Sequence, residues 1–269
     1  MRLSKFFSSI FILSLNPLSA VAFADSSSKS HAPVPWQVGL QSPASGTAVM
    51  MYDFYDLLLV IIGLITFFVC ALLVYVGIRF HEKRNPVPSQ LTHHTGLEIV
   101  WTLIPALILV VIAIPSFRVL HNQLELPKED IVLKATAHQW YWSYAYQNLP
   151  DGPISFDSTL VPEDKLKPGQ IRLLSVDNEV VLPVGKVVRL QITASDVIHA
   201  FALPAFGVKI DAVPGRLNET WFKADKEGIY YGQCSVICGQ NHAYMPISIR
   251  IVSEDAYQEW LQKARQTFS

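Results

Sequence analysis

Two long apolar runs lie in the first half of the chain, at residues 57–78 and 99–117, and neither contains a charged residue. Each is long enough to cross the ~30 Å hydrocarbon core of a membrane as a helix, which requires about 20 residues. Pro105 and Pro115 interrupt the second run, and a packed membrane helix tolerates this with a bend. The pattern predicts a transmembrane hairpin over residues 53–120, with helices at about residues 55–80 and 97–118.

The charges that flank these runs indicate how the hairpin is oriented. The linker between the runs carries three basic residues and one acidic residue at residues 79–84, whereas Asp53 and Asp56 lie at the other end of the first run. Short loops rich in Lys and Arg stay on the cytoplasmic side of the membrane. We therefore expect a cytoplasmic linker and two termini on the outer side.

Residues 1–24 have the pattern of a secretory signal peptide. A basic start precedes an apolar stretch, and Ala22-Phe23-Ala24 supplies a small-x-small cleavage site. The alternative is a third membrane anchor, but about ten apolar residues are too few to span a bilayer. Residues 25–52 would then be an exported N-terminal segment.

After residue 130 the pattern changes to short runs rich in Val, Ile, Tyr and Thr, separated by Pro, Gly and Asp. Short strands at such regular intervals predict a small antiparallel β-sandwich or barrel over residues 130–253. A helical spacing of apolar residues marks only the tail, residues 254–269. The clearest predicted strands are residues 131–136, 171–176, 186–193, 220–222, 228–231 and 247–252.

The composition excludes one class of partner. The 269 residues carry a formal net charge of -1, and 51% of them are hydrophobic, an excess that is concentrated in the membrane hairpin. A protein that binds nucleic acid would be expected to carry a basic face. We therefore expect no nucleic-acid partner.

The candidate chemistry is concentrated in "CSVICGQNHAYM", residues 234–245, between the last two predicted strands. The side chains that could bind a metal are Cys234, Cys238, His242, Met245 and, further upstream, His199. A disulfide between the two cysteines would suit an exported domain, but it would leave the histidines and the methionine unexplained. Zinc would use two cysteines and two histidines and would leave the thioether idle.

Copper would use the whole set. Thiolates and a thioether are soft ligands that suit Cu(I), and imidazole suits both oxidation states of copper. Two cysteines can bridge two copper ions, with one histidine for each ion and with the methionine and a backbone carbonyl as weak outer ligands. An electron shared over two bridged ions changes each bond little, and no position remains open for a substrate. Such a site would transfer electrons.

This loop resembles a known family when it is read with the His199 segment, the hairpin, "HQWYWSY" (residues 138–144) and "DAVPGRLN" (residues 211–218). Together they resemble subunit II of aa₃-type cytochrome c oxidases, over about residues 53–260. The resemblance implies a cupredoxin-like domain with a binuclear CuA centre. Its ligands would be the five side chains above and the main-chain carbonyl of Val236.

The resemblance also implies a function and a location. The chain would accept electrons from cytochrome c at CuA and pass them to the heme and CuB centres of subunit I, where oxygen reduction is coupled to proton pumping. Its partners would be subunit I, other oxidase subunits, cytochrome c and membrane lipid. The location would be a bacterial inner membrane, with the C-terminal domain in the periplasm.

Further roles are implied outside the ligand set. Trp140 would receive the electron from cytochrome c, and Glu98 would lie at the mouth of a proton channel. From the residues alone, the aromatic run could equally be a buried sheet face, and Glu98 could be a charge in the first turn of a helix. The acids expected to dock the basic cytochrome are Asp157, Asp177 and Asp196.

Val236 departs from the family pattern. The family has Glu at this position, and the side chain of that Glu binds a magnesium or manganese ion shared with subunit I. A valine side chain cannot bind such an ion, so we do not expect a normal interfacial ion here.

Three other functions fit part of the pattern. A quinol oxidase subunit of the same fold would lack the copper ligands, and a CuA domain of the nitrous-oxide-reductase type would leave the two-helix anchor unexplained. A membrane-tethered copper chaperone should expose a labile site. Oxidation of reduced cytochrome c by the purified complex would separate these functions from that of an oxidase subunit.

Overall fold

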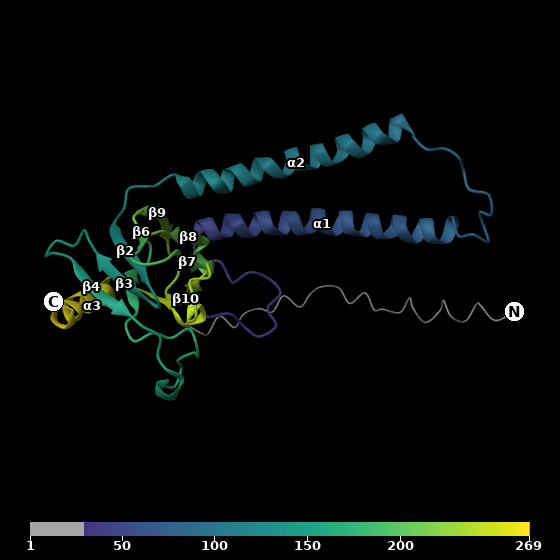
Figure 1. The fold of residues 1–269 in the computed structure, drawn as a ribbon. Coiled ribbons are helices and arrows are strands. Elements are labelled where there is room, and N and C mark those ends of the chain that lie inside the picture. The colour runs from purple at the N-terminus through teal and green to yellow at the C-terminus, as the bar shows by residue number, and fades with distance from the viewer. Residues whose placement is uncertain (1–29, 269) are drawn as a thin grey trace.

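The computed structural model describes residues 30–268, so the predicted signal peptide lies outside the described residues. A helical hairpin projects from one side of a β-domain, and the C-terminal helix lies on the domain's far side (Figure 1). The described part of the chain therefore has a two-helix anchor and a separate globular β-domain. This arrangement is the one that the hydrophobic pattern predicts.

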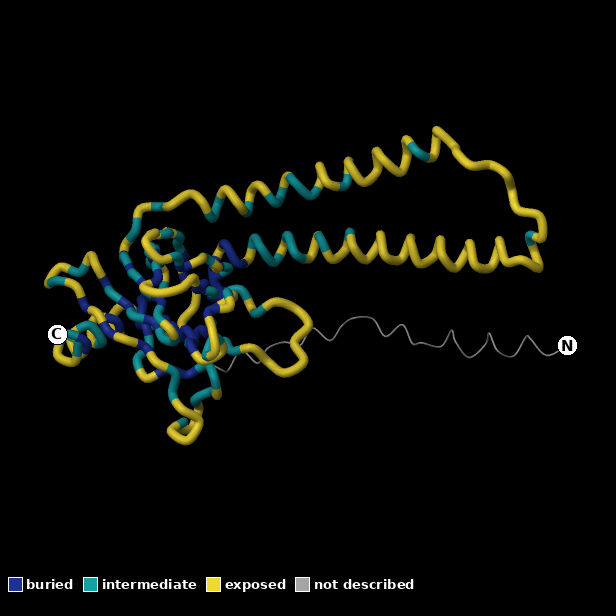
Figure 2. The backbone as a smooth tube through the Cα atoms, in the orientation of Figure 1, coloured by how far each residue is buried: buried dark blue, intermediate teal, exposed yellow. Residues whose placement is uncertain are grey.

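The hairpin consists of α1 (Gly46–Arg79) and α2 (Thr95–Leu124), which run side by side (Figure 1). Both are long and apolar enough to span a membrane, and their apolar side chains are almost all exposed in the isolated chain (Figure 2). α1 begins earlier than the predicted residue 55 and ends at Arg79, and α2 extends past the predicted 97–118 at both ends.

The β-domain contains ten strands after the hairpin, and one short strand precedes it. The strands are β1 (Ser30–His31), β2 (Ile131–His138), β3 (Tyr141–Tyr146), β4 (Ile154–Ser158), β5 (Val180–Pro183), β6 (Val187–Ala194), β7 (His199–Leu203), β8 (Val208–Ala212), β9 (Asn218–Lys223), β10 (Gly228–Cys234) and β11 (Pro246–Val252). Three short 3₁₀ helices, η1 (Glu163–Lys165), η2 (Pro204–Phe206) and η3 (His242–Tyr244), lie between strands, and α3 (Glu254–Thr267) ends the described chain.

The strands form two sheets that enclose one core. One sheet has the order β5-β11-β10-β7-β8, with β1 beside β10, and the other has the order β4-β3-β2-β6-β9. Buried and partly exposed residues alternate along β2, β3 and β6, so one face of that sheet turns inward. The core between the sheets is rich in aromatic rings, including Trp142, Tyr144, Tyr146, Phe201 and Phe206. The fold is therefore a β-sandwich.

One predicted strand is wrong. Residues 171–174 form turns, because the backbone N–H groups of Leu174 and Ser175 both donate to the carbonyl of Ile171. Leu173 has a left-handed backbone, with φ of 65°. Val176 makes only an isolated bridge to Leu160. The apolar residues of this segment pack as a compact loop instead of pairing along an edge.

A set of polar contacts joins the hairpin to the β-domain. Ser45 caps α1 by accepting from Ala48 N, and its hydroxyl donates to the carbonyl of Phe206 at 2.9 Å. Trp221 in β9 donates its indole N–H to the carbonyl of Asn122 in α2. These bonds attach the N-terminal end of α1 and the C-terminal end of α2 to the β-domain.

Candidate metal centre

Strand pairing brings three separate parts of the chain to one end of a sheet. β10 ends at Cys234 and β11 begins at Pro246, and these antiparallel neighbours pair up to Gln233 and Pro246. β7, which begins at His199, pairs with the other edge of β10, with Cys234 opposite Phe201. The loop of residues 235–245 is therefore closed at its base and lies beside the first residue of β7.

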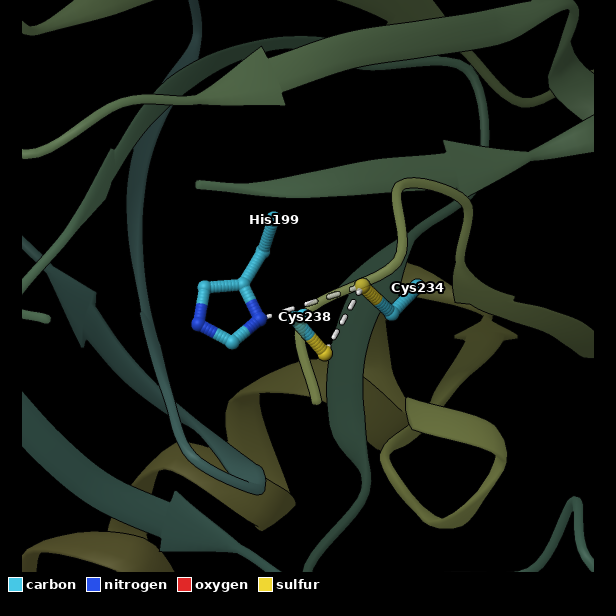
Figure 3. A group of neighbouring side chains, drawn as sticks. All are labelled: His199, Cys234 and Cys238. Atoms are coloured by element: carbon cyan, nitrogen blue, oxygen red, sulfur yellow. Dashed lines mark hydrogen bonds between the residues drawn. The ribbon is translucent and has the colours of Figure 1, made fainter. Parts of the chain in front are cut away.

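All five predicted side-chain donors meet in this place. The Sγ atoms of Cys234 and Cys238 are 3.9 Å apart, and Nδ1 of His199 lies 3.8 Å from Cys234 Sγ (Figure 3). Cys238 Sγ lies 3.5 Å from Nδ1 of His242 and 3.6 Å from Sδ of Met245. The nearest donors of His199, Cys234 and Cys238 all lie within 4.8 Å of one another.

The two cysteines are free thiols in a dry environment. Their sulfur atoms are almost twice as far apart as the ~2.05 Å of a disulfide bond. Burial, followed by the neighbouring Cys234, raises the pKa of the Cys238 thiol to about 11. At neutral pH a metal ion would have to displace that proton, and its positive charge would then stabilise two thiolates that the protein interior disfavours.

Hydrogen bonds outside the donor set hold the donors in place. The ring Nε2 of His199 lies 2.9 Å from Oδ1 of Asp196, which leaves Nδ1 to face the thiols. The carbonyl of Cys238 accepts from the side chain of Gln139 at 2.8 Å, and that of Met245 accepts from the indole of Trp142 at 3.2 Å. Such outer contacts fix the ring orientation and the position of metal ligands.

Asp196 makes several of these outer hydrogen bonds, a role that the sequence did not predict. Its carboxylate accepts the backbone N–H groups of Gln139, at 2.7 Å, and Val197, at 2.6 Å, in addition to the bond with His199. Burial would raise its pKa, but these hydrogen bonds outweigh burial and lower the pKa of Asp196 below its usual value. The carboxylate is therefore ionised and ties the His199 ring to the turn at Gln139.

The donor chemistry fits copper better than zinc. Met245 is 1% exposed and turns its thioether toward Cys238, where a zinc site has no use for it. The carbonyl oxygen of Val236 lies 3.4 Å from Cys234 Sγ and adds a sixth donor at the edge of the cluster. Two thiols, two imidazoles, a thioether and a carbonyl make a soft, largely buried set, which suits a copper pair that exchanges electrons.

Trp140 lies over the same loop. It is half-buried in the turn before β3, so it does not share the inward face of that strand with Trp142. Its ring covers Gly239, where an added Cβ would lie only 2.9 Å from Cζ2 of the indole. Its indole N–H has no hydrogen-bond acceptor among residues 30–268, and it lies near enough to Cys238 to affect the pKa of that thiol slightly.

The other predicted residues lie at two different places. Asp157 and Asp177 are exposed on adjoining segments of the β-domain, where Asp157 accepts from Ser143 Oγ and Asp177 accepts from Thr159. Glu98 lies in the first turn of α2, at the end of the hairpin far from the domain (Figure 1). Its carboxylate accepts from the backbone N–H of His94 at 3.2 Å, and Nδ1 of His94 accepts from the backbone N–H of Leu97, so both side chains cap the start of α2.

Comparisons with known proteins point to one family. Residues 131–252 match the family described as "Cytochrome C oxidase subunit II, periplasmic domain", and residues 33–119 match "Cytochrome C oxidase subunit II, transmembrane domain". The chain is 50% identical over 229 residues to the "Probable cytochrome c oxidase subunit 2" of Rickettsia bellii, covering 85% of this chain and 84% of that relative. It is 47% identical over 251 residues to the "Cytochrome c oxidase subunit 2" of Cereibacter sphaeroides, covering 87% and 82%.

A solved structure is also similar. It is the crystal structure of the periplasmic domain of subunit II of the cytochrome oxidase of Bradyrhizobium japonicum, with 58% identity and a TM-score of 0.50. The match covers 54% of this chain and 100% of that one. The β-sandwich that the sequence predicts is therefore confirmed, but its sheets are mixed and not purely antiparallel, because β2 pairs with β6 and β5 with β11 in parallel.

The contacts of Asp196 predict that its substitution weakens copper binding. In Asp196→Asn, the amide NH₂ would face one of the N–H groups that the carboxylate now accepts, so the His199 ring would lose part of its support. We expect the affinity of the metal-free chain for Cu(I) to fall about 10–100-fold, as is typical when such outer contacts are removed. A competition titration against a Cu(I) chelator measures it.

Asp157→Asn is the matched control for this titration. Asp157 accepts from Ser143 and contacts none of the donors, so its substitution should leave copper affinity unchanged. Equal affinities for Asp196→Asn and the unsubstituted chain would show that Asp196 does not position His199.

Proposed function

The chain belongs to the cytochrome c oxidase subunit II family, the electron-accepting, CuA-containing subunit of heme–copper oxidases, and we propose that the six donors around Cys234 and Cys238 hold its two copper ions. The observation that carries this proposal is the position of Met245, whose buried thioether faces the thiol pair. Two copper ions bound here would accept and release one electron reversibly.

The residues of this chain would hold the two copper ions in a fixed arrangement of donors. Cys234 ends β10 and Cys238 lies in the loop that follows, whose base is paired strand to strand, so we propose that the thiols keep their positions when the charge of the site changes. Low displacement of the donors lowers the reorganisation that opposes electron transfer. Four of the donor residues are buried, so we propose that the site binds no substrate and that oxygen reduction takes place elsewhere in the complex.

Electron entry would pass through Trp140. Its ring lies between the outer surface of the loop and Cys238, and it is partly exposed, so a donor protein could touch it directly. The exit would lead to heme and CuB in subunit I, where oxygen reduction would be coupled to proton pumping. This route needs other oxidase subunits as partners, and cytochrome c as the donor.

The charges of the chain support a location in a bacterial inner membrane with the β-domain in the periplasm. The linker between α1 and α2 carries Arg79, Lys83 and Arg84, which favours a cytoplasmic linker. The relatives from Rickettsia and Cereibacter are bacterial. Glu98 would then face the cytoplasmic side, where we propose that it lies at the mouth of a proton channel of subunit I as well as capping α2.

Two other functions have less support. A copper chaperone would need an accessible site, but Cys234 and Cys238 are only 6% and 5% exposed. A CuA domain of the nitrous-oxide-reductase type would leave the hairpin, which matches the transmembrane part of the subunit II family, without a purpose.

Electron paramagnetic resonance tests the copper proposal. The intact chain loaded with copper should bind two ions and give a mixed-valence spectrum whose hyperfine pattern comes from two equivalent coppers. Cys234→Ser should convert the site to a single copper or empty it, because one thiolate cannot bridge a pair. A four-line signal from one copper in the unsubstituted chain would exclude the binuclear centre.

The docking acids are tested by salt dependence. Neutralising the exposed carboxylates in Asp157→Asn and Asp177→Asn should slow association with the basic cytochrome, while the rate of electron entry in the bound complex stays the same. The defect should fade as salt rises, because exposed charges are screened over ~8 Å at physiological ionic strength. Stopped-flow oxidation of cytochrome c at several salt concentrations measures it.

Two variants serve as controls for docking. Glu219→Gln alters an exposed carboxylate on β9, at the opposite edge of the sheet from β4, and should have no effect. Trp140→Phe should slow electron entry and leave the salt dependence intact. A defect in Asp157→Asn that persists at high salt would mean that this residue acts on the structure and not on docking.

Val236 leads to a prediction about a second metal. Its carbonyl is available to copper, as for any residue, so we expect a normal CuA signal. Magnesium takes oxygen ligands and commonly only one or two carboxylates, so the loss of one should leave the interfacial divalent site weak or empty. Metal analysis and manganese resonance of the chelator-washed oxidase should show more bound ion in Val236→Glu than in the unsubstituted complex. A full divalent site in the unsubstituted complex would contradict this expectation.

A further inference from the structure

The segment between β1 and α1 exposes large apolar side chains with no charged neighbour in sequence. Residues 32–52 contain no Asp, Glu, Lys or Arg. Within them, residues 33–41, here termed the N-terminal loop, leave Trp36 98% exposed and Val38 94% exposed. Val34 and Leu40 are also exposed. A tryptophan that is almost completely bare on a protein surface is unusual, since large aromatic rings are highly buried on average.

Hydrogen bonds hold the N-terminal loop in this conformation. Val34 and Gln37 close a turn through two contacts, from Gln37 N to Val34 O and from Val34 N to Gln37 Oε1, each of 3.2 Å. Gln37 Nε2 then donates to the carbonyl of Leu40 at 2.7 Å. Trp36, between these residues, has a left-handed backbone with φ of 63°, which is uncommon for a residue other than glycine. The chain thus builds a fixed turn that directs Trp36 outward.

A contact with α1 sets the height of the N-terminal loop relative to the membrane. The hydroxyl of Tyr52 in α1 donates to the carbonyl of Leu40 at 2.6 Å. Tyr52 precedes the uncharged run, which begins at Leu57, by a distance of about 8 Å at the 1.5 Å rise of a helix. The polar layer on each side of the hydrocarbon core is about 5–8 Å thick. The Leu40 carbonyl therefore lies at the level of the lipid headgroups.

The path of the chain takes the tip of the N-terminal loop toward the membrane. Figure 1 shows this segment, in purple, leaving the β-domain and bending back on the same side as the hairpin. Figure 2 shows that it is exposed along almost its whole course. The side chains at its tip thus approach the boundary between headgroups and hydrocarbon, which is the layer that Trp prefers in membrane proteins.

We propose that the N-terminal loop is an interfacial anchor that inserts Trp36 and Val38 among the lipid headgroups of the outer leaflet. A convex, uncharged tip fits a deformable lipid layer, whereas a rigid protein partner would need a matching hollow. The indole can bury its ring beside the upper acyl chains while its N–H remains near polar groups. The anchor would hold the β-domain at a fixed height above the bilayer. This inference does not depend on the copper proposal.

Site-specific photocrosslinking in the assembled oxidase tests the anchor. Trp36 is replaced by p-benzoylphenylalanine in the full chain, the bacterial membranes are irradiated, and the peptide that contains position 36 is analysed by mass spectrometry. We expect adducts with the mass of a membrane phospholipid. The same substitution at Gln266, exposed on α3 at the far end of the domain, should give no lipid adduct.

Two results would overturn the anchor. A crosslink from position 36 to another oxidase subunit would assign the N-terminal loop to a protein interface. The absence of any adduct, with the label shown to be incorporated and photoactive, would place the tip in water. Because crosslinking is read only in the assembled complex that retains its copper spectrum, a failure of the variant to fold would be seen before irradiation.

Discussion

The register of three neighbouring strands is the constraint on which the candidate metal centre depends. β10 pairs with β7 on one edge and with β11 on the other, so Cys234, His199 and Met245 are brought to one end of the sheet by backbone hydrogen bonds alone. Gly232 lies so close to the carbonyl of Ala202 that no side chain would fit between the two strands. The donors are therefore positioned by the fold before any metal binds.

The second constraint is the cost of burying two thiols together. A buried thiolate is disfavoured, and a second one beside it is disfavoured further by repulsion, which is why the pKa of Cys238 is raised. The positive charge of bound metal ions would offset both the burial and the repulsion. The protein interior therefore favours two thiolates here only when metal is bound. The thiols and the thioether are buried, which suits the electron-transfer role proposed for this centre.

Much of the architecture follows from the sequence because its signals are local. The uncharged runs predict the hairpin, and Cys234, Cys238 and His242 lie in one loop, so their proximity needs no knowledge of the fold. The segment at residues 171–176 shows the limit of such signals, since its apolar residues suit a strand but its backbone closes turns on Ile171. The bond between Asp196 and Gln139 joins residues far apart in the chain, and only the pairing of β2 with β6 brings them together.

That bond links the turn that carries Trp140, the proposed point of electron entry, to the candidate metal centre. Asp196 accepts the N–H of Gln139, the residue before Trp140, and also holds the ring of His199. The side chain of Gln139 donates to the carbonyl of Cys238, so the turn that presents the indole is bonded to both sides of the donor set. A partner protein that pressed on Trp140 would therefore act on a turn that shares its supports with two ligands. Asp196 was predicted as a docking charge, and it is exposed, but its carboxylate also takes part in this network, so a substitution there would alter the centre as well as the surface.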